Sequence, residues 1–124
     1  ERALAFYRNT DWNKLAKLMV DAGLMVATKA KSGPEMYKVC VDRMTALLAL
    51  TAIHDIMKVE ALLPTVQPQH APFGGFQAGD RINDHDVALG YILEHFGQAL
   101  PSYAEMPADL QHTIRFTQVQ IAFN

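Results

Sequence analysis

The stretch that decides the fold is MTALLALTAIHDIMK, residues 44–58. From Ala46 to Ile53 it is apolar on nearly every face of a helix, and such a helix is usually buried in the middle of a bundle. We therefore predict a long central helix that begins at Ser32-Gly33-Pro34, where proline suits the first turn, and that ends before Pro64. Its core positions continue on both sides of the quoted stretch, from Tyr37 and Cys40 to Leu62 or Leu63.

Upstream of this segment, the spacing of apolar residues predicts another helix. Thr10 or Asp11 is a suitable N-cap for it. We expect Trp12, together with Tyr7, to anchor its start. A single apolar stripe then recurs at intervals of three and four residues, which is the helical period; it comprises Leu15, Leu18, Met19, Ala22, Met25 and Val26.

Two further helices are predicted downstream. One starts at Asn83 or Asp84 and ends near Gly97, a suitable C-cap, and the other starts near Pro107. Pro101 to Pro107 is expected to be a connector. No segment shows a sustained two-residue alternation, so we predict no sheet. The fold class expected is all-α, a compact helical bundle of four to six helices.

Between the central helix and the next one, residues 64–82 are rich in proline and glycine, with Phe73 and Phe76 among them. We predict one long ordered loop, which folds back onto the core or covers a cleft. Loops of this length are uncommon in compact domains and are often functional. A protein partner docking on loop 64–82 is one possible role for it.

Composition excludes several classes of protein. The 124 residues carry a formal net charge of -2 and 19% charged residues, spread along the chain, which favours neither disorder nor nucleic-acid binding. No run of about 18 apolar residues exists, so no membrane span is expected. The lone Cys40 forms no internal disulfide; we expect it buried on a helix, and it favours a reducing intracellular compartment. We expect one soluble domain, residues 1–124, belonging to a longer chain that begins before Glu1.

The residues most informative about chemistry are His54-Asp55-Ile56-Met57-Lys58. An imidazole and a carboxylate side by side suit a divalent metal such as Mn, Fe, Mg or Zn. Lys58 lies one turn after His54 on the same helical face, where its ammonium group could hold a phosphate oxygen. Metal and cation together are what phosphoester hydrolysis needs, because the metal activates a water molecule and both charges stabilise the transition state.

This segment resembles the His-Asp-Ile-Gly-Lys motif of the HD-domain metal-dependent phosphohydrolases, especially the HD-GYP branch. The stretch from His85 to Leu93 is similar to that branch's next helix, and the likeness covers roughly residues 44–112. It implies an HD-like fold and a phosphodiesterase or nucleotide phosphoester hydrolase. It also implies His54 and Asp55 as metal ligands, His85 and His112 as ligands of a second metal, and Asp55 and Lys58 as catalytic groups.

The sequence departs from that family in ways that keep other functions open. There is no histidine before His54, Met57 stands where the family has a glycine, and the GYP residues are absent. Impaired catalysis is one possibility. The alternative is a non-catalytic HD-like helical subunit that binds or supports a larger assembly, and a third reading is a sensor of a nucleotide or other small molecule.

Simpler structural roles compete with several of these assignments. His54 and Asp55 could be a hydrogen-bonded polar pair at a helix end, with Lys58 reaching water. Asp84 and Asp86, with Asp80 and His85, could bind a cation, but capping of the next helix by Asp84 is favoured. The other two histidines are given no catalytic role: His70 is expected to be solvated in the loop, and His95 to contact carbonyls at a helix end.

Overall fold

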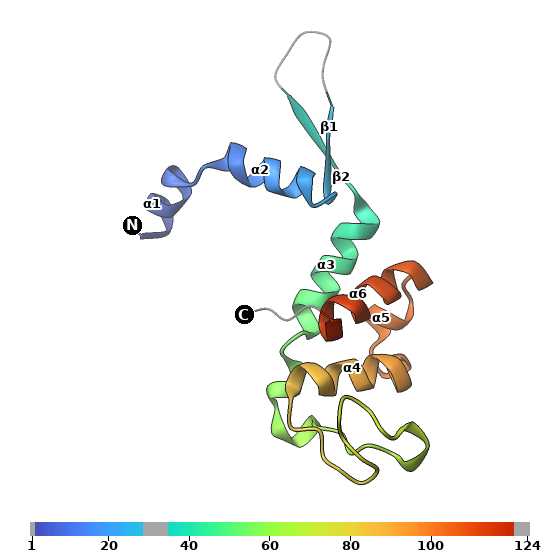
Figure 1. Ribbon diagram of the computed structural model, residues 1–124. Helices are drawn as coiled ribbons and strands as arrows, with labels where there is room; N and C mark the ends of the chain where they lie inside the picture. The colour runs from blue at the N-terminus through green and yellow to red at the C-terminus, as the bar shows by residue number, and fades with distance from the viewer. Residues whose placement is uncertain (1, 29–34, 121–124) are drawn as a thin grey trace. The chain divides into compact units, whose positions relative to one another are not determined.

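The computed structural model describes residues 2–28 and 35–120. Over these residues the chain forms six α-helices and two short strands (Figure 1). It divides into two compact units, Glu1–Met44 and Thr45–Asn124. The prediction of a mostly helical chain is confirmed, whereas the prediction of no sheet is wrong. None of the helices in the described ranges has the length and apolar character needed to cross a membrane.

The first unit opens with α1 (Arg2–Asn9) and α2 (Trp12–Asp21). Asp11 is the N-cap of α2, as predicted, and its side chain accepts a hydrogen bond of 3.0 Å from the Lys14 backbone N–H. Trp12 packs on Tyr7 with ring centroids 4.7 Å apart, and its Nε1–H donates to the Tyr7 carbonyl oxygen at 3.0 Å. The expected anchoring of this helix by Trp12 and Tyr7 is therefore confirmed.

A two-stranded antiparallel hairpin follows, β1 (Met25–Thr28) paired with β2 (Met36–Val39). The predicted stripe had carried Met25 and Val26 on the helix, but Gly23, with φ +70°, ends the helical path just beyond α2. Cys40 is half-buried and directly follows β2, where its N–H donates to the Leu24 carbonyl oxygen at 2.9 Å. The prediction of a buried helical Cys40 is therefore wrong.

Helix α3 (Val41–Ile53) begins in the first unit and continues into the second. It is shorter than predicted, because Tyr37 belongs to β2 and the chain beyond Ile53 forms 3₁₀ turns at Ile56–Lys58 and Glu60–Leu62. The predicted start at Ser32-Gly33-Pro34 lies outside the described residues. The expectation of burial on every face is also wrong: the buried positions are Ala46, Ala49 and Ile53, while Leu48 is 62% exposed.

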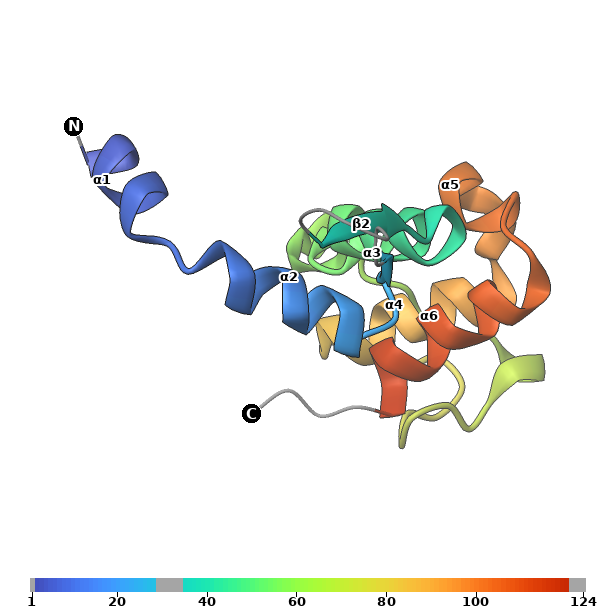
Figure 2. The same ribbon diagram turned by 90° about the horizontal axis from the view of Figure 1, so that it is seen from above.

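The core of the second unit is centred on α4 (His85–His95). Helix α6 (Ala108–Gln120) lies along α4, and the short α5 (Pro101–Ala104) occupies most of the predicted connector (Figures 1 and 2). Both α4 and α6 start where the sequence predicted. The largest fully buried side chains come from α4, α6 and the ends of the long loop: Tyr91, Leu89, Leu93, Ile114, Ile82 and Val66.

Residues 64–82 form the predicted long loop and fold back onto this core. The two ends of the loop pair as an antiparallel bridge between Thr65 and Arg81, which we call the loop neck. At its tip, Phe73 and Phe76 exchange backbone hydrogen bonds of 3.0 and 2.8 Å around Gly74-Gly75. Both glycines have positive φ, as the tightest hairpin turns require.

Substitution of Gly74 should destabilise the loop tip more than the same substitution at Gly75. Both positions have positive φ, so alanine at either is strained by about 1 kcal/mol or more. A Cβ at Gly74 would also collide with Val87 of α4, whereas one at Gly75 meets nothing within 4 Å. Thermal unfolding of Gly74→Ala and Gly75→Ala measures the difference. Equal losses of stability would show that the tip does not pack on α4 in this way.

Candidate functional site

His54 and Asp55 lie on the turn between α3 and the 3₁₀ turn at Ile56–Lys58. The His54 N–H still donates to the Leu50 carbonyl oxygen at 2.8 Å, so His54 is held by the last turn of the helix. Ile53 before the pair and Met57 after it are both 6% exposed and belong to the core. The polar pair is therefore fixed in place by apolar residues on either side.

The hydrogen bonds of His54 leave one ring nitrogen available as a ligand. Its Nδ1 lies 2.8 Å from the Thr51 carbonyl oxygen. A carbonyl only accepts, so this bond assigns the ring proton to Nδ1 and the lone pair to Nε2. Nε2 in turn lies 3.5 Å from Asp55 Oδ1. Metal-ligating histidines are commonly oriented by such a backbone carbonyl, although the side chains of this pair are 51% and 49% exposed.

Asp55 lies among cationic groups that keep it ionised. Lys58 Nζ is 2.8 Å from Asp55 Oδ1. This hydrogen bond is the main reason why the pKa of Asp55 is below its ordinary value. Burial opposes it and is the second-largest effect, and the charges of His54, Lys58 and His85 each lower the pKa further. Lys58 therefore pairs with Asp55 in this structure. The influence of His85 indicates that the start of α4 lies near the His-Asp turn.

A pocket of about 450 Å³ lies beside this turn. Three of its lining residues are basic: Lys58, His85 and Arg81, whose guanidinium group donates to the Glu60 carbonyl oxygen. Arg81 was not identified from the sequence, although it directly precedes Ile82, which is fully buried. The full lining is Met57, Lys58, Glu60, Leu63, Arg81, Asn83 and His85. Lys58 and Arg81 against Glu60 leave one formal positive charge in excess on the lining, which favours an anionic ligand.

His85 also belongs to a small acidic cluster at the start of α4. Asp84, His85 and Asp86 offer ligand atoms that all lie within 4.8 Å of one another. However, Asp84 Oδ1 already accepts from the Asp86 and Val87 N–H groups at 2.9 and 3.0 Å, and Asp86 Oδ1 accepts from Gln118 Nε2 at 2.8 Å. The capping role favoured for Asp84 is thus confirmed. The carboxylates of Asp84 and Asp86 both already accept hydrogen bonds from the protein.

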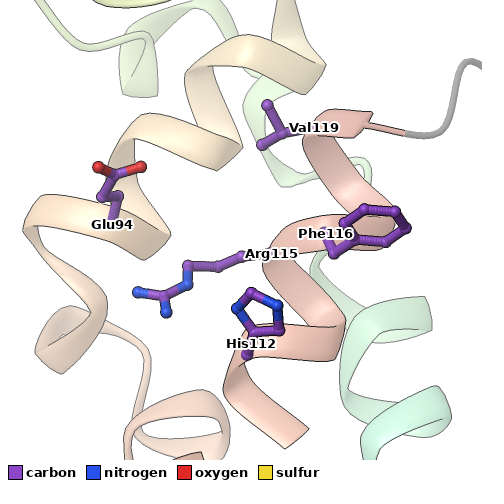
Figure 3. Close-up of a pocket in the computed structure, with 5 residues that line it drawn as sticks. All are labelled: Glu94, His112, Arg115, Phe116 and Val119. Carbon is purple, nitrogen blue, oxygen red and sulfur yellow. The ribbon is translucent and has the colours of Figure 1, made fainter. Parts of the chain in front are cut away.

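His112 does not lie with the other predicted ligands. It lines a separate hollow of about 360 Å³ between α4 and α6, next to Arg115 and Glu94 (Figure 3). Glu94 is nine residues after His85 on α4, which is roughly 13 Å along the helix axis. His85 therefore lies at one end of α4 and His112 lies near the other end. The two side chains are too far apart to bind the same metal ion.

The two remaining histidines stack on each other at the end of α4. His70 is half-buried and contacts Tyr91 and His95, so the expectation that it is solvated is wrong. His95 stacks on His70, and among residues 2–28 and 35–120 its buried Nε2 has no hydrogen-bond partner, which differs from the expected contact with helix-end carbonyls. No local pattern predicts this pairing, because 25 residue positions separate the two rings.

Comparisons of the chain with protein-family models, with curated proteins and with solved structures find no match. The resemblance to the HD-domain phosphohydrolases therefore remains a prediction that rests on the residues themselves. The site is accordingly interpreted from its own geometry and charge.

Two substitutions at Asp84 should separate its capping role from a role as a metal ligand. Asp84→Ala removes the acceptor for two N–H groups and should cost about 1 kcal/mol of unfolding free energy, whereas Asp84→Asn retains a good N-cap. Chemical denaturation of both variants gives this difference. If Asp84→Asn were as unstable as Asp84→Ala, the carboxylate charge and not capping would be the important property.

The pKa of Asp55 should depend on Lys58. Because the Lys58 hydrogen bond is the largest cause of the lowered value, Lys58→Met should move the Asp55 pKa upwards. Lys58→Arg retains a cation and is the matched control, which should leave the pKa low. The side-chain carboxyl carbon of Asp55, followed by NMR through an acid titration, reports both. An unchanged pKa in Lys58→Met would mean that the ion pair does not form in solution.

Proposed function

We propose that this chain is an HD-like metal-dependent phosphohydrolase, in which His54, Asp55 and His85 hold a divalent metal while Lys58 and Arg81 hold the phosphate of a nucleotide or related phosphoester. One observation carries the proposal: an ordered His-Asp pair lies directly beside a pocket lined by three basic side chains. The His-Asp pair would bind the metal ion, and the adjacent pocket would bind the anionic substrate.

The donor atoms suit a divalent ion. Two ligand atoms about 2.1 Å from a tetrahedral ion are about 3.4 Å apart, and His54 Nε2 and Asp55 Oδ1 are separated by 3.5 Å. Two imidazoles and a carboxylate are also a donor set typical of non-haem iron and of zinc. Within the described ranges, the pair has no third ligand atom within 4.8 Å of both members, so His85 must approach when the ion binds.

When bound, a divalent ion would supply Lewis-acid polarisation of the phosphoester and would acidify a water molecule. The side chains have complementary tasks. Arg81 offers a planar pair of donors that matches two phosphate oxygens, whereas Lys58 is a compact charge that keeps Asp55 ionised. Met57 lines the same pocket from the core side, at the position where the sequence resemblance has a glycine, and it limits the depth available to a substrate.

A second candidate function is a non-catalytic HD-like module that binds an anionic ligand or supports an assembly. The observation that favours it is the exposure of the pair: His54 and Asp55 are half-exposed, and the third proposed ligand, His85, does not lie within 4.8 Å of both, which is typical of a solvated polar pair. The basic pocket would then bind a phosphate group without turnover. Metal binding distinguishes the two functions.

Manganese binding should require the His-Asp pair. Titration of the protein with Mn²⁺, followed by electron paramagnetic resonance, should show one site that His54→Ala and Asp55→Ala each weaken by at least about tenfold, since each removes a ligand. His112→Ala is the matched control and should bind as the unaltered protein does, because His112 lines a different hollow.

Hydrolysis should depend on Arg81 through substrate binding and not through metal binding. With bis(4-nitrophenyl) phosphate as substrate, Arg81→Met should retain Mn²⁺ binding but raise KM, because it removes a phosphate contact and no metal ligand. A protein that binds none of Mn²⁺, Fe²⁺ or Zn²⁺ and hydrolyses nothing with them present would refute the hydrolase and favour the non-catalytic module.

A further inference from the structure

A pair of stacked histidines joins the long loop to α4. His70 comes from the 3₁₀ turn Pro68–His70 of the loop, and His95 is the last residue of α4. Their ring centroids are 3.8 Å apart and the ring planes differ by 6°. Phe73 and Phe96 pack edge-on around the pair, so the two imidazoles lie in a largely aromatic environment.

The hydroxyl of Tyr91 joins His70 to the backbone of the long loop. The Gln67 backbone N–H donates to the Tyr91 hydroxyl at 2.9 Å, and His70 Nδ1 lies 2.9 Å from the same oxygen. The hydroxyl of Tyr91 therefore holds the loop backbone and the His70 ring together. Because the His70 and His95 rings stack face to face at 3.8 Å, a positive charge on one ring disfavours a positive charge on the other.

The surroundings of His95 disfavour a protonated ring. Its Nε2 is buried and has no hydrogen-bond partner within the part of the chain that the structure describes. Burial is the main reason why the pKa of His95 is below its ordinary value, and the charge of His70 lowers it further, while that of Glu94, on the same helix, raises it. Tyr91 is the other titratable group in contact, and Gln67, Phe73 and Phe96 carry no charge.

The remaining attachments of the loop do not involve titratable side chains. At the loop neck, the Val66 N–H donates to the Asp80 carbonyl oxygen at 2.9 Å, and the Ile82 N–H donates to that of Pro64 at 3.0 Å. These backbone bonds hold at any pH at which the domain is folded. A proton taken up by the histidines thus acts on the tip of the loop and leaves its neck in place.

We propose that the stacked His70–His95 pair is an acid-sensitive latch that holds the loop tip, residues 67–78, on α4 at neutral pH and releases it on protonation. Release has a defined consequence: the aromatic side chains of Phe73 and Tyr91 lose the contact that covers them, and an apolar surface opens on α4. The latch is independent of the proposed hydrolase, since His54, Asp55 and His85 are not part of it.

The direction of the pH effect follows from the neutral state of the closed form. Because the His95 pKa is lower in the closed loop than in the open one, closing is fully favourable above about pH 6.5, the ordinary histidine value. As the pH falls below that value, His95 binds a proton in the open form but not in the closed form. The closing equilibrium therefore weakens by up to about tenfold per pH unit for each proton involved.

Hydrogen exchange at single amides tests the latch. The Gln67 amide is the reporter, because it donates to Tyr91, and the Val66 and Ile82 amides report on the neck. After correction for the intrinsic rate, Gln67 protection should fall about tenfold between pH 7.5 and pH 5.5, while that of Val66 and Ile82 holds. His95→Phe keeps a stacked ring without a titratable group and should abolish most of the fall.

His112→Phe is the matched control, since it makes the same change at an exposed histidine outside the latch, and it should leave the fall intact. If His95→Phe fails to fold, His70→Gln gives the same test, because its amide oxygen can accept from Tyr91 without titrating. Unchanged Gln67 protection at pH 5.5 would overturn the latch. So would a loss of protection shared equally by Gln67, Val66 and Ile82, which would mean global unfolding.

Discussion

The hydroxyl of Tyr91 is the contact on which the second unit depends most. The side chain is fully buried in α4, and its single polar atom receives the Gln67 N–H from the long loop while meeting His70 at 2.9 Å. A loop without regular secondary structure leaves many backbone groups to satisfy. Tyr91 satisfies one of them in the core and at the same time gives the loop a fixed position, which no purely apolar side chain could do.

The fixed loop in turn assembles the candidate site from distant parts of the sequence. Lys58 follows the end of α3, Arg81 stands at the loop neck, and His85 opens α4, yet all three line one pocket. Two of them, Lys58 and His85, are also among the groups that lower the pKa of Asp55, and the Lys58 hydrogen bond has the largest effect. The electrostatics of the site are thus a product of the fold, because only His54, Asp55 and Lys58 are neighbours in the chain.

Much of the second unit could be predicted from the sequence, because its signals are local. Asp84 has the side chain of an N-cap, the spacing of apolar residues in α4 and α6 is helical, and proline and glycine mark the loop. The hairpin could not be predicted, because strands of four residues are too short to show an alternating pattern against the helical spacing around them. Arg81 and the His70–His95 stack were missed because they depend on contacts across the loop.

The antiparallel bridge at the loop neck has a consequence for how the chain tolerates change in length. Residues 77–80 form an exposed turn next to the neck. The Gly79 N–H donates to the Val66 carbonyl oxygen at 2.9 Å, and the Asp80 carbonyl oxygen accepts from the Val66 N–H at 2.9 Å, so the end of this turn belongs to the neck. The entropy of closing a loop rises slowly with its length, by about 0.6 kcal/mol for each doubling. Extra residues after Ala78 would therefore cost little in chain entropy, and their main cost would be the two hydrogen bonds between Gln77 and Asp80 that close the turn.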